Sequence, residues 1–432
     1  MALPRLLIAD FTPMHGTAAT SRLKANHFGD WPADRCLQVT LDPATAELAL
    51  GTSDGRYRAV NGGQAAAQAL DQAFAPQIIL YRPTSDSPKL HSFVQSLLQT
   101  SKAALVLWLM DDWPAQLMAE DRKNGQYWDD QLKALSSRAQ LALAISPTMA
   151  VAFEERYGLA FETASNFVEL PSTPPRARRA KEGQIRLRYA GSLSPEMSLA
   201  AVDRLARFVE NDAGRALGLH FDIRTQDHWF ELYGHQFSGR DHVSIQRSDL
   251  SAAEYEAWLS DADVLVAAYN DDETTKRYLR YSFANKIPEL LSSGRPVIAI
   301  GPKEIETIRF LKETGAAAVV LDPGDRALEE ALRSLCIDAK ARERLAEAAF
   351  DVAKAYFSAE SGKQRLRQKL VAIAAPRPEP ASSALHAAKA VSRDHPANLS
   401  LKVRIAIALA SVPAGAAVLR GLSRLRSPKP RR

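Results

Sequence analysis

The sequence has 432 residues, 46% of them hydrophobic and 24% charged, which indicates a globular chain too long for one ordinary domain. Pro376 to Arg432 holds 11 Lys or Arg against two Asp or Glu, so the net charge of +5 belongs to this tail and excludes a basic nucleic-acid-binding core. The two cysteines fit no zinc or redox spacing, and the first residues lack the pattern of a signal peptide; both features favour a cytoplasmic protein.

The first part of the chain, residues 1–170, alternates apolar, β-rich runs with helical segments. Such fully apolar strands are typical of a parallel sheet that helices cover on both faces. We therefore expect an N-terminal Rossmann-like domain. Its predicted strands are residues 5–12, 77–82, 104–110 and 141–146.

Prolines and positive charge in "PSTPPRARRAKEG", residues 171–183, predict a surface linker. The alternation then restarts and ends in a long helical region, so residues 184–374 form a second Rossmann-like domain. The predicted fold is α/β, with two doubly wound domains that face a cleft, where ligands bind beyond the carboxyl ends of the strands. The predicted strands of the second domain are residues 185–193, 219–225, 262–270, 295–301 and 316–322.

The end of the chain divides into two segments. Residues 375–398 are rich in Pro and Ala and predict a flexible spacer. Residues 399–432 contain an uncharged stretch, Ile405 to Leu419, that is flanked by basic residues and too short to span a bilayer. This basic amphipathic tail predicts binding to an anionic membrane surface; the alternatives are a helix docked on the protein itself, or disorder.

One stretch carries the clearest chemistry, "YSFANKIPELLSSGRPVIAI", residues 281–300. Its proline, Pro288, fits only the first turn of a helix, which places Lys286 and Glu289 beside free backbone N–H groups. A lysine at such a position suits a phosphate, and a carboxylate beside it suits sugar hydroxyls. The alternative is an ordinary solvated first turn.

This stretch resembles the donor-site signature of retaining GT-B glycosyltransferases, the large bacterial group that builds surface polysaccharides. "RYAGSLS" (188–194) resembles the strand and glycine loop that open the family's donor domain, and "DLSAAEYEAWLSDADVLVAAY" (249–269) resembles the helix and strand ahead of the donor motif. "TPMHGTAATSRL" (12–23) and "DDWPAQL" (111–117) resemble loops of its acceptor domain. The similarity covers most of the two predicted domains in the correct order.

The resemblance implies transfer of a sugar from a nucleotide-diphospho-sugar to a hydroxyl of a glycan or lipid-linked acceptor, with retention and without an obligatory metal or other cofactor. It places Lys286 near the diphosphate and Glu289 on the nucleotide ribose. The leaving phosphate itself can accept the acceptor proton, so no dedicated protein base is required. It also implies a role in surface polysaccharide synthesis, in the cytoplasm or at the inner face of the membrane.

The candidate site residues follow from these motifs. The catalytic candidates are Lys286, Glu289, Arg280 and Asp111; the donor-binding candidates are Gly191, Ser192, Arg224, Arg277, Tyr281, Lys286 and Glu289; the acceptor-side candidates are His15, Gly16, Asp112 and Trp113. For the acceptor-side residues the alternatives are a simple turn at His15, a helix cap at the two aspartates, and packing for Trp113.

Two departures from the family pattern leave other functions open. Tyr281 stands where the family usually has a second glutamate, and Ser192 stands in the loop that usually supplies a cation. Arg224, Arg277 and Arg280 would then have to supply positive charge. The alternatives are a non-catalytic GT-B module that binds a glycan or partner protein, and a GT-B nucleotide-sugar epimerase.

Overall fold

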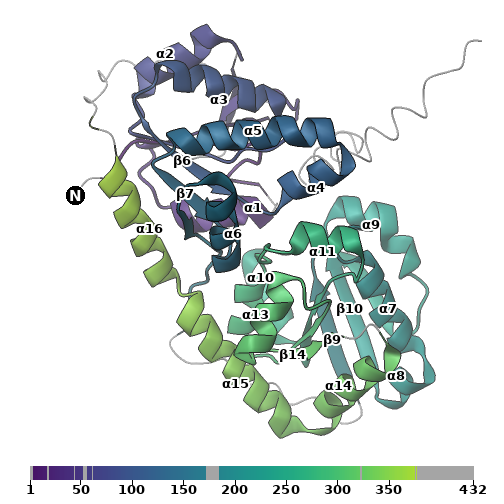
Figure 1. Cartoon of the computed structure of the whole chain (residues 1–432). Coiled ribbons are helices and arrows are strands. Elements are labelled where there is room, and N and C mark those ends of the chain that lie inside the picture. Colours follow the sequence, from purple (N-terminus) through teal and green to yellow (C-terminus); the bar gives the residue numbers. More distant parts are fainter. Residues whose placement is uncertain are drawn as a thin grey trace, which may run out of the picture. The chain divides into compact units, whose positions relative to one another are not determined.

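The structure is a computed structural model that describes residues 3–16, 19–42, 44–51, 56–60, 62–171, 184–321, 324–374 and 376 (Figure 1). The predicted linker after residue 171, the predicted spacer (except Pro376) and the tail that we expect to bind a membrane lie outside these residues. The described chain forms two units. Unit 1 comprises residues up to Ala164 and those from Lys363 on, and unit 2 comprises Ser165–Gly362.

The last helix, α16 (Ala359–Ile373), therefore begins in unit 2 and ends in unit 1, whereas the sequence assigned all of residues 184–374 to the second domain. Its contacts explain the difference. Lys369 pairs with Glu162, and Arg367 pairs with Asp30, and both acids belong to unit 1.

The described part of unit 1 contains an eight-stranded sheet in the order β4-β3-β2-β1-β5-β6-β7-β8. The strands from β2 to β8 in this order pair in parallel, and β3 runs antiparallel to β2 and to β4. The strands are β1 (Leu6–Ala9), β2 (Cys36–Leu41), β3 (Leu48–Gly51), β4 (Tyr57–Ala59), β5 (Ile78–Tyr81), β6 (Ala104–Leu109), β7 (Leu141–Ala144) and β8 (Phe161–Thr163).

Helices connect these strands, and α2, α3 and α5 lie over the same side of the sheet (Figure 1). The helices of unit 1 before α16 are α1 (Ala19–Phe28), α2 (Gln64–Phe74), α3 (Pro88–Thr100), α4 (Trp113–Glu120), α5 (Arg122–Arg138) and α6 (Pro147–Tyr157).

Within the described residues of unit 2, six strands pair in parallel in the order β11-β10-β9-β12-β13-β14. The strands are β9 (Ile185–Ala190), β10 (Leu219–Thr225), β11 (Val243–Arg247), β12 (Val264–Ala268), β13 (Val297–Ile300) and β14 (Ala318–Val320).

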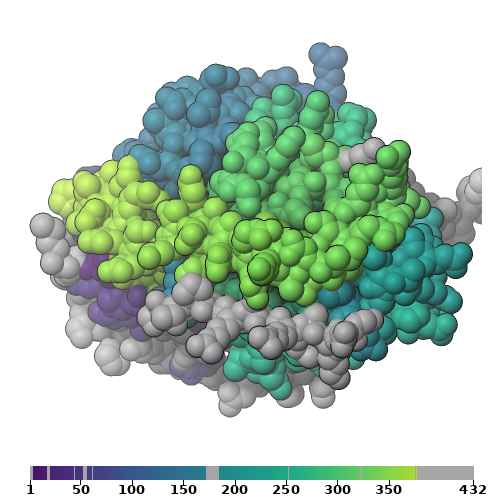
Figure 2. Space-filling model, turned by 90° about the horizontal axis from the view of Figure 1, so that it is seen from below, coloured from purple at the N-terminus to yellow at the C-terminus, as the bar shows by residue number. Residues whose placement is uncertain are grey.

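Helices lie on both sides of this sheet, with α7 and α9 on one side of β9 and β10 and α10 and α13 on the other (Figure 1). Figure 2 shows a face on which the last helices, α14 to α16, lie at the surface. The helices are α7 (Leu199–Glu210), α8 (Asp212–Ala216), α9 (Asp227–Tyr233), the 3-10 helix η1 (Gly234–Gln236), α10 (Ala252–Ser260), α11 (Glu273–Leu279), α12 (Ile287–Ser292), α13 (Glu306–Thr314), α14 (Asp325–Ile337) and α15 (Ala339–Tyr356).

The α/β fold class and all nine predicted strands are confirmed. Most of these strands are runs of apolar residues buried on both faces of the sheet, whereas β10 buries only every second residue. β6, for example, is buried at every residue from Ala104 to Leu109. The sequence missed β2, β3, β4, β8 and β11. These strands are short, or mix polar with apolar residues because they lie at or near a sheet edge.

Candidate functional site

Helix α12 begins right after Lys286 and has Pro288 in its first turn, as the sequence predicts. Ile287, Leu290 and neighbouring apolar residues are buried and hold this short helix against α15. Gly294, in the left-handed conformation at φ 70°, turns the chain into β13. The local sequence thus fixes Lys286 at the start of a buried helix.

The side chain of Lys286 meets the end of β9 and the glycine loop. Its Nζ donates to the carbonyl oxygen of Ala190 at 3.2 Å and lies 4.1 Å from the ring centre of Tyr189. A Cβ atom added to Gly191 would lie 2.6 Å from this Nζ, so a larger residue there would make the ammonium group move. The structure therefore brings Lys286 and Gly191, two of the predicted donor residues, into contact.

Tyr189 is itself fixed by the loop that it supports. Its hydroxyl donates to the carbonyl oxygen of Ser192 at 2.7 Å, and the Ser198 hydroxyl donates to the same oxygen at 2.6 Å. The aromatic face beneath the ammonium group is thus held in one orientation. A ring face attracts a cation without neutralising it.

Lys286 makes no ion pair with any described residue. Burial disfavours its charged form and lowers its pKa to about 7, against a smaller, opposing attraction from Glu289 in the first turn of α12. A partly buried cation without a paired acid is costly, and an anionic ligand would remove this cost. The arrangement is chemically suited to a phosphate or diphosphate group.

Several buried residues that the sequence analysis did not assign position this site. The Asn166 side chain donates to the carbonyl oxygen of Asn285 at 2.7 Å, directly before Lys286. The Thr307 hydroxyl accepts from the Ala284 N–H at 3.1 Å. Asn270 accepts from the N–H of Ala201 and donates to the carbonyl oxygen of Pro195, which ties the end of the glycine loop to β12. Of these three residues only Asn270 ends a predicted strand, so the sequence carries little signal for such a role.

The other cationic candidates lie apart from the Lys286 contacts. Arg277 and Arg280 are exposed at the end of α11, and the Arg280 guanidinium lies 5.3 Å from the ring centre of Tyr281. The Arg224 guanidinium donates to the carbonyl oxygen of Arg247 and to the Gln246 side chain, so it would have to break these bonds to reach a ligand. Its backbone carbonyl accepts from the Gly191 N–H at 3.0 Å.

In unit 1, Asp112 is buried, caps α4 and forms a two-pronged ion pair with Arg156. This supports the capping alternative. Trp113 is also buried and packs its ring edgewise on Trp128, as the packing alternative expects. Asp111 is different. It is partly exposed at the end of β6 with φ 63°, a left-handed conformation that is strained for a residue other than glycine.

His15 and Gly16 lie in the loop after β1. The His15 side chain is exposed. A Cβ atom on Gly16 would lie 2.8 Å from the Ser21 hydroxyl, so the loop folds closely against the start of α1.

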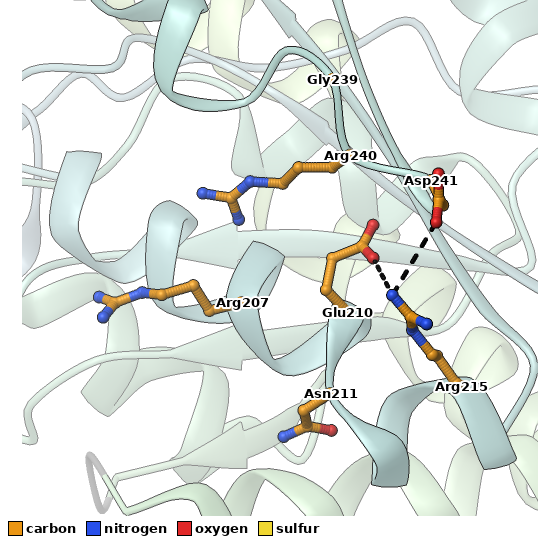
Figure 3. A pocket seen from close by; sticks show the side chains of 7 residues that line it. All are labelled: Arg207, Glu210, Asn211, Arg215, Gly239, Arg240 and Asp241. Carbon is orange, nitrogen blue, oxygen red and sulfur yellow. Dashed lines mark hydrogen bonds and ion pairs between the residues drawn. The ribbon is translucent and has the colours of Figure 1, made fainter.

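A hollow elsewhere in unit 2 contains none of the predicted residues. It has a volume of about 550 Å³ and lies where α7 ends and β11 approaches (Figure 3). Its arginines are paired with acids: Arg215 with Glu210, and Arg240 with Asp203. Because acids already neutralise these arginines, the hollow offers little net positive charge to an anionic ligand. The lining residues are Arg207, Glu210, Asn211, Arg215, Gly239, Arg240 and Asp241.

The described residues lack both a membrane-spanning helix and a metal-binding cluster. None of their helices is long and apolar enough to cross a membrane. The same residues contain no group of three or more His, Cys, Asp or Glu side chains placed to hold a metal ion.

No family model and no curated protein matches the chain by sequence. Its structure is similar to sucrose-phosphate synthase from Thermosynechococcus elongatus, with a TM-score of 0.63, 13% identity, and coverage of 85% of this chain and 98% of that one. HepE from Anabaena, in complex with UDP and glucose, gives a TM-score of 0.60 at 12% identity and covers 85% of this chain and 100% of its own. TarM gives 0.52 at 11% identity over 76% of this chain, which spans only 61% of TarM. These proteins are GT-B glycosyltransferases, and the fold of the chain is GT-B.

Proposed function

We propose that the protein is a glycosyltransferase that moves a sugar from a nucleotide-diphospho-sugar to a hydroxyl group of a glycan or lipid-linked acceptor. The observation that carries this proposal is Lys286, a cation without an acid partner in the described chain, held between Tyr189 and Gly191 at the carboxyl end of β9. In a doubly wound sheet this is the edge at which ligands bind.

The proposed chemistry is electrostatic. As the bond from the sugar to the diphosphate breaks, negative charge grows on the leaving phosphate, and a fixed ammonium group stabilises it. Lys286 would donate to a diphosphate oxygen, and the ion pair would raise its lowered pKa again. Glu289, one turn further on, would accept hydrogen bonds from hydroxyl groups of the nucleotide ribose.

The finer parts of the proposal derive from the sequence resemblance. They are retention of configuration, transfer without a metal ion, and proton acceptance by the leaving phosphate. The role in bacterial surface polysaccharide synthesis, the cytoplasmic location and the attachment of residues 399–432 to an anionic membrane surface are likewise proposals from the sequence.

One observation favours a second function, a GT-B module that binds a glycan or nucleotide without catalysis. Arg224 is engaged by β11, and the glycine loop offers Ser192 where the family usually has a cation. The donor site would then bind a glycan or nucleotide, but it would stabilise the negative charge on a leaving phosphate poorly.

Thermal unfolding with UDP, GDP and ADP tests the proposal. A nucleotide at 100 times its Kd should stabilise the protein by about 2.7 kcal/mol. Lys286→Met and Glu289→Ala should weaken this effect, and Lys340→Met, at an exposed lysine of α15, should leave it unchanged. Stabilisation with no sugar transfer from the matching nucleotide-sugars would favour the binding module. If no nucleotide shifts the unfolding temperature of the wild-type protein, the donor site proposed here does not exist.

A further inference from the structure

A network of buried polar side chains lies behind the loop that follows β1. Nζ of Lys24, on α1, lies 2.5 Å from Oδ2 of Asp10, and both side chains are at most 2% exposed. Nη1 of Arg82, directly after β5, lies 3.2 Å from the other oxygen of Asp10. Two cations thus share one carboxylate. Three segments that are far apart in the sequence meet here.

These side chains bond to one another and also to the backbone of the loop after β1. Oδ1 of Asp10 accepts from the Thr12 N–H at 2.9 Å. The Thr12 carbonyl oxygen accepts from Lys24 Nζ and, at 2.9 Å, from Nε2 of Gln38. The other end of the Gln38 amide accepts from the Met14 N–H at 2.8 Å. Each of these contacts fixes a main-chain group of the loop.

Further contacts complete the hold on residues 12–16, which we name the β1 loop. The Thr40 hydroxyl donates to the carbonyl oxygen of Phe11, just before it, at 3.2 Å. Gly16, at its end, fits against Ser21 with no space for a side chain. Between the anchored positions, His15 is exposed and makes no hydrogen bond or ion pair with another described residue. The loop therefore presents one polar side chain on a fixed backbone.

Stability alone does not account for this design. Replacing a buried ion pair with apolar side chains of similar size is often neutral or stabilising, so a buried pair is weak evidence for a purely stabilising role. A loop backbone that is held by buried hydrogen bonds fixes the point from which a ligand-contacting side chain extends. The β1 loop also leaves the sheet at the carboxyl end of β1, the ligand-binding edge of this fold.

We propose that Lys24, together with Asp10 and Gln38, is a positioning residue that holds the β1 loop so that His15 contacts a hydroxyl group of the carbohydrate acceptor. A neutral imidazole has one donor and one acceptor nitrogen, which suits a sugar hydroxyl. The inference rests on the proposed function, because it assumes a carbohydrate acceptor. Lys24, Asp10 and Gln38 act through the loop and do not touch the substrate.

The first test is hydrogen–deuterium exchange on the full chain, with and without a panel of methyl glycosides as acceptor probes. In the wild type, at least one glycoside should slow exchange in residues 12–16. Lys24→Met and Gln38→Leu should speed exchange of the free loop about tenfold and abolish the protection, since each removes a hydrogen bond to its backbone. His15→Ala should keep the slow exchange and lose the protection. Gln38→Leu keeps the ion pair, so it tests the loop even if Lys24→Met does not fold.

The second test separates positioning from a general loss of structure. UDP-glucose serves as the donor probe, and its hydrolysis by water is compared with transfer to the glycoside. The three variants should raise the KM for the glycoside about tenfold, the cost of about one hydrogen bond, and change hydrolysis less than twofold. Lys89→Met, which removes an exposed lysine paired with Glu47 on the same unit, should change neither.

Three results would overturn the inference. The first is that no methyl glycoside protects the β1 loop of the wild type. The second is that the fast-exchanging variants keep the wild-type KM, and the third is that hydrolysis falls in parallel with transfer. If UDP-glucose is neither bound nor hydrolysed, that result counts against the donor proposal. The protection of the loop by glycosides then still decides whether the loop contacts carbohydrate.

Discussion

Each unit has a lysine beside the carboxyl end of its sheet, fully buried in unit 1 and partly buried in unit 2, and the two lysines have opposite surroundings. Lys24 in unit 1 faces the carboxylate of Asp10, whereas Lys286 in unit 2 faces the ring of Tyr189 and the carbonyl oxygen of Ala190. Burial lowers the pKa of both, to about 8 for Lys24 and about 7 for Lys286. Lys24 also donates to the backbone of the β1 loop. Lys286 has no acid partner in the described chain, and we propose that it binds an anion. The proposed difference in role follows from the partner of each lysine and not from its burial alone.

The largest expected effect comes from breaking the paired site. Lys24→Met leaves Asp10 buried with Arg82 as its remaining cation, and removing one member of a buried pair costs about 3 to 5 kcal/mol of the free energy of unfolding. Urea denaturation measures this loss. The double variant Lys24→Met/Asp10→Leu should recover much of it, and Lys89→Met, at an exposed pair, should cost less than about 1 kcal/mol. A loss no larger than that of Lys89→Met would contradict the pairing.

Lys286→Met should have the reverse effect: it should weaken nucleotide binding without lowering the stability of the fold. Hydrogen bonds to charged groups contribute about 1.5 to 3 kcal/mol, so nucleotide affinity should fall by about 10- to 100-fold. The free energy of unfolding should stay the same or rise, since the variant removes a buried charge that has no acid partner. Calorimetric titration with nucleotide and urea denaturation measure the two quantities. A variant that loses stability and keeps its affinity would assign Lys286 to the structure instead.

The pH dependence of nucleotide binding tests whether Lys286 is the group that contacts the nucleotide. Free Lys286 loses its proton above about pH 7, and a bound diphosphate would raise its pKa, so affinity should fall by up to about tenfold per pH unit from pH 7 to 9. Binding at pH 8 should take up a proton, which titrations in buffers of different ionisation enthalpy detect. Lys286→Arg keeps its charge and should show a flat profile. An equal slope in the arginine variant would exclude Lys286 as the titrating group.

The same shift has a consequence for stability. The pKa of Lys286 is lower in the folded than in the unfolded chain, so the unfolded chain binds more protons between about pH 7 and 10. The contribution of this group to the free energy of unfolding therefore rises with pH over that range. Comparing the wild type with Lys286→Met by urea denaturation at pH 7 and 9 should reveal it.

The smallest expected effect is at Asp111. Glycine adopts the left-handed conformation without strain, but it also raises the conformational entropy of the unfolded chain. These effects oppose each other, so Asp111→Gly should change the free energy of unfolding by less than about 1 kcal/mol. If Asp111 orients an acceptor, transfer should fall while donor hydrolysis remains. Asp111→Asn tolerates the same backbone and isolates the charge. Unchanged transfer in both variants would reduce Asp111 to a turn residue.

The fold was predictable from the sequence because the central strands, such as β6 and β13, are apolar on both faces. Edge strands were missed because only one of their faces is buried. In β11, Ser244 and Gln246 are exposed and alternate with less exposed residues, and the run is too short to stand out. The end of α16 was assigned to the wrong unit because its partners, Asp30 and Glu162, are distant in the sequence.

The site was predictable only in part. Gly191 directly follows a predicted strand and Lys286 begins a predicted helix, and each of these patterns is local in sequence. Their contact joins segments that are far apart in the chain and depends on the parallel sheet. The engagement of Arg224 by Gln246 depends on side-chain choices across two strands. The support from Asn166 and Tyr189, and the whole network around Lys24, depend on contacts between distant segments, which no local pattern encodes.

The narrow gap between Gly191 and the ammonium group of Lys286 also constrains how this protein can evolve. A side chain at position 191 would crowd the ammonium group of Lys286 and the hydroxyl of Tyr189. The lysine would then have to move away from the end of β9. Among homologous sequences we therefore expect the two to vary as a pair, with glycine kept wherever the lysine is kept.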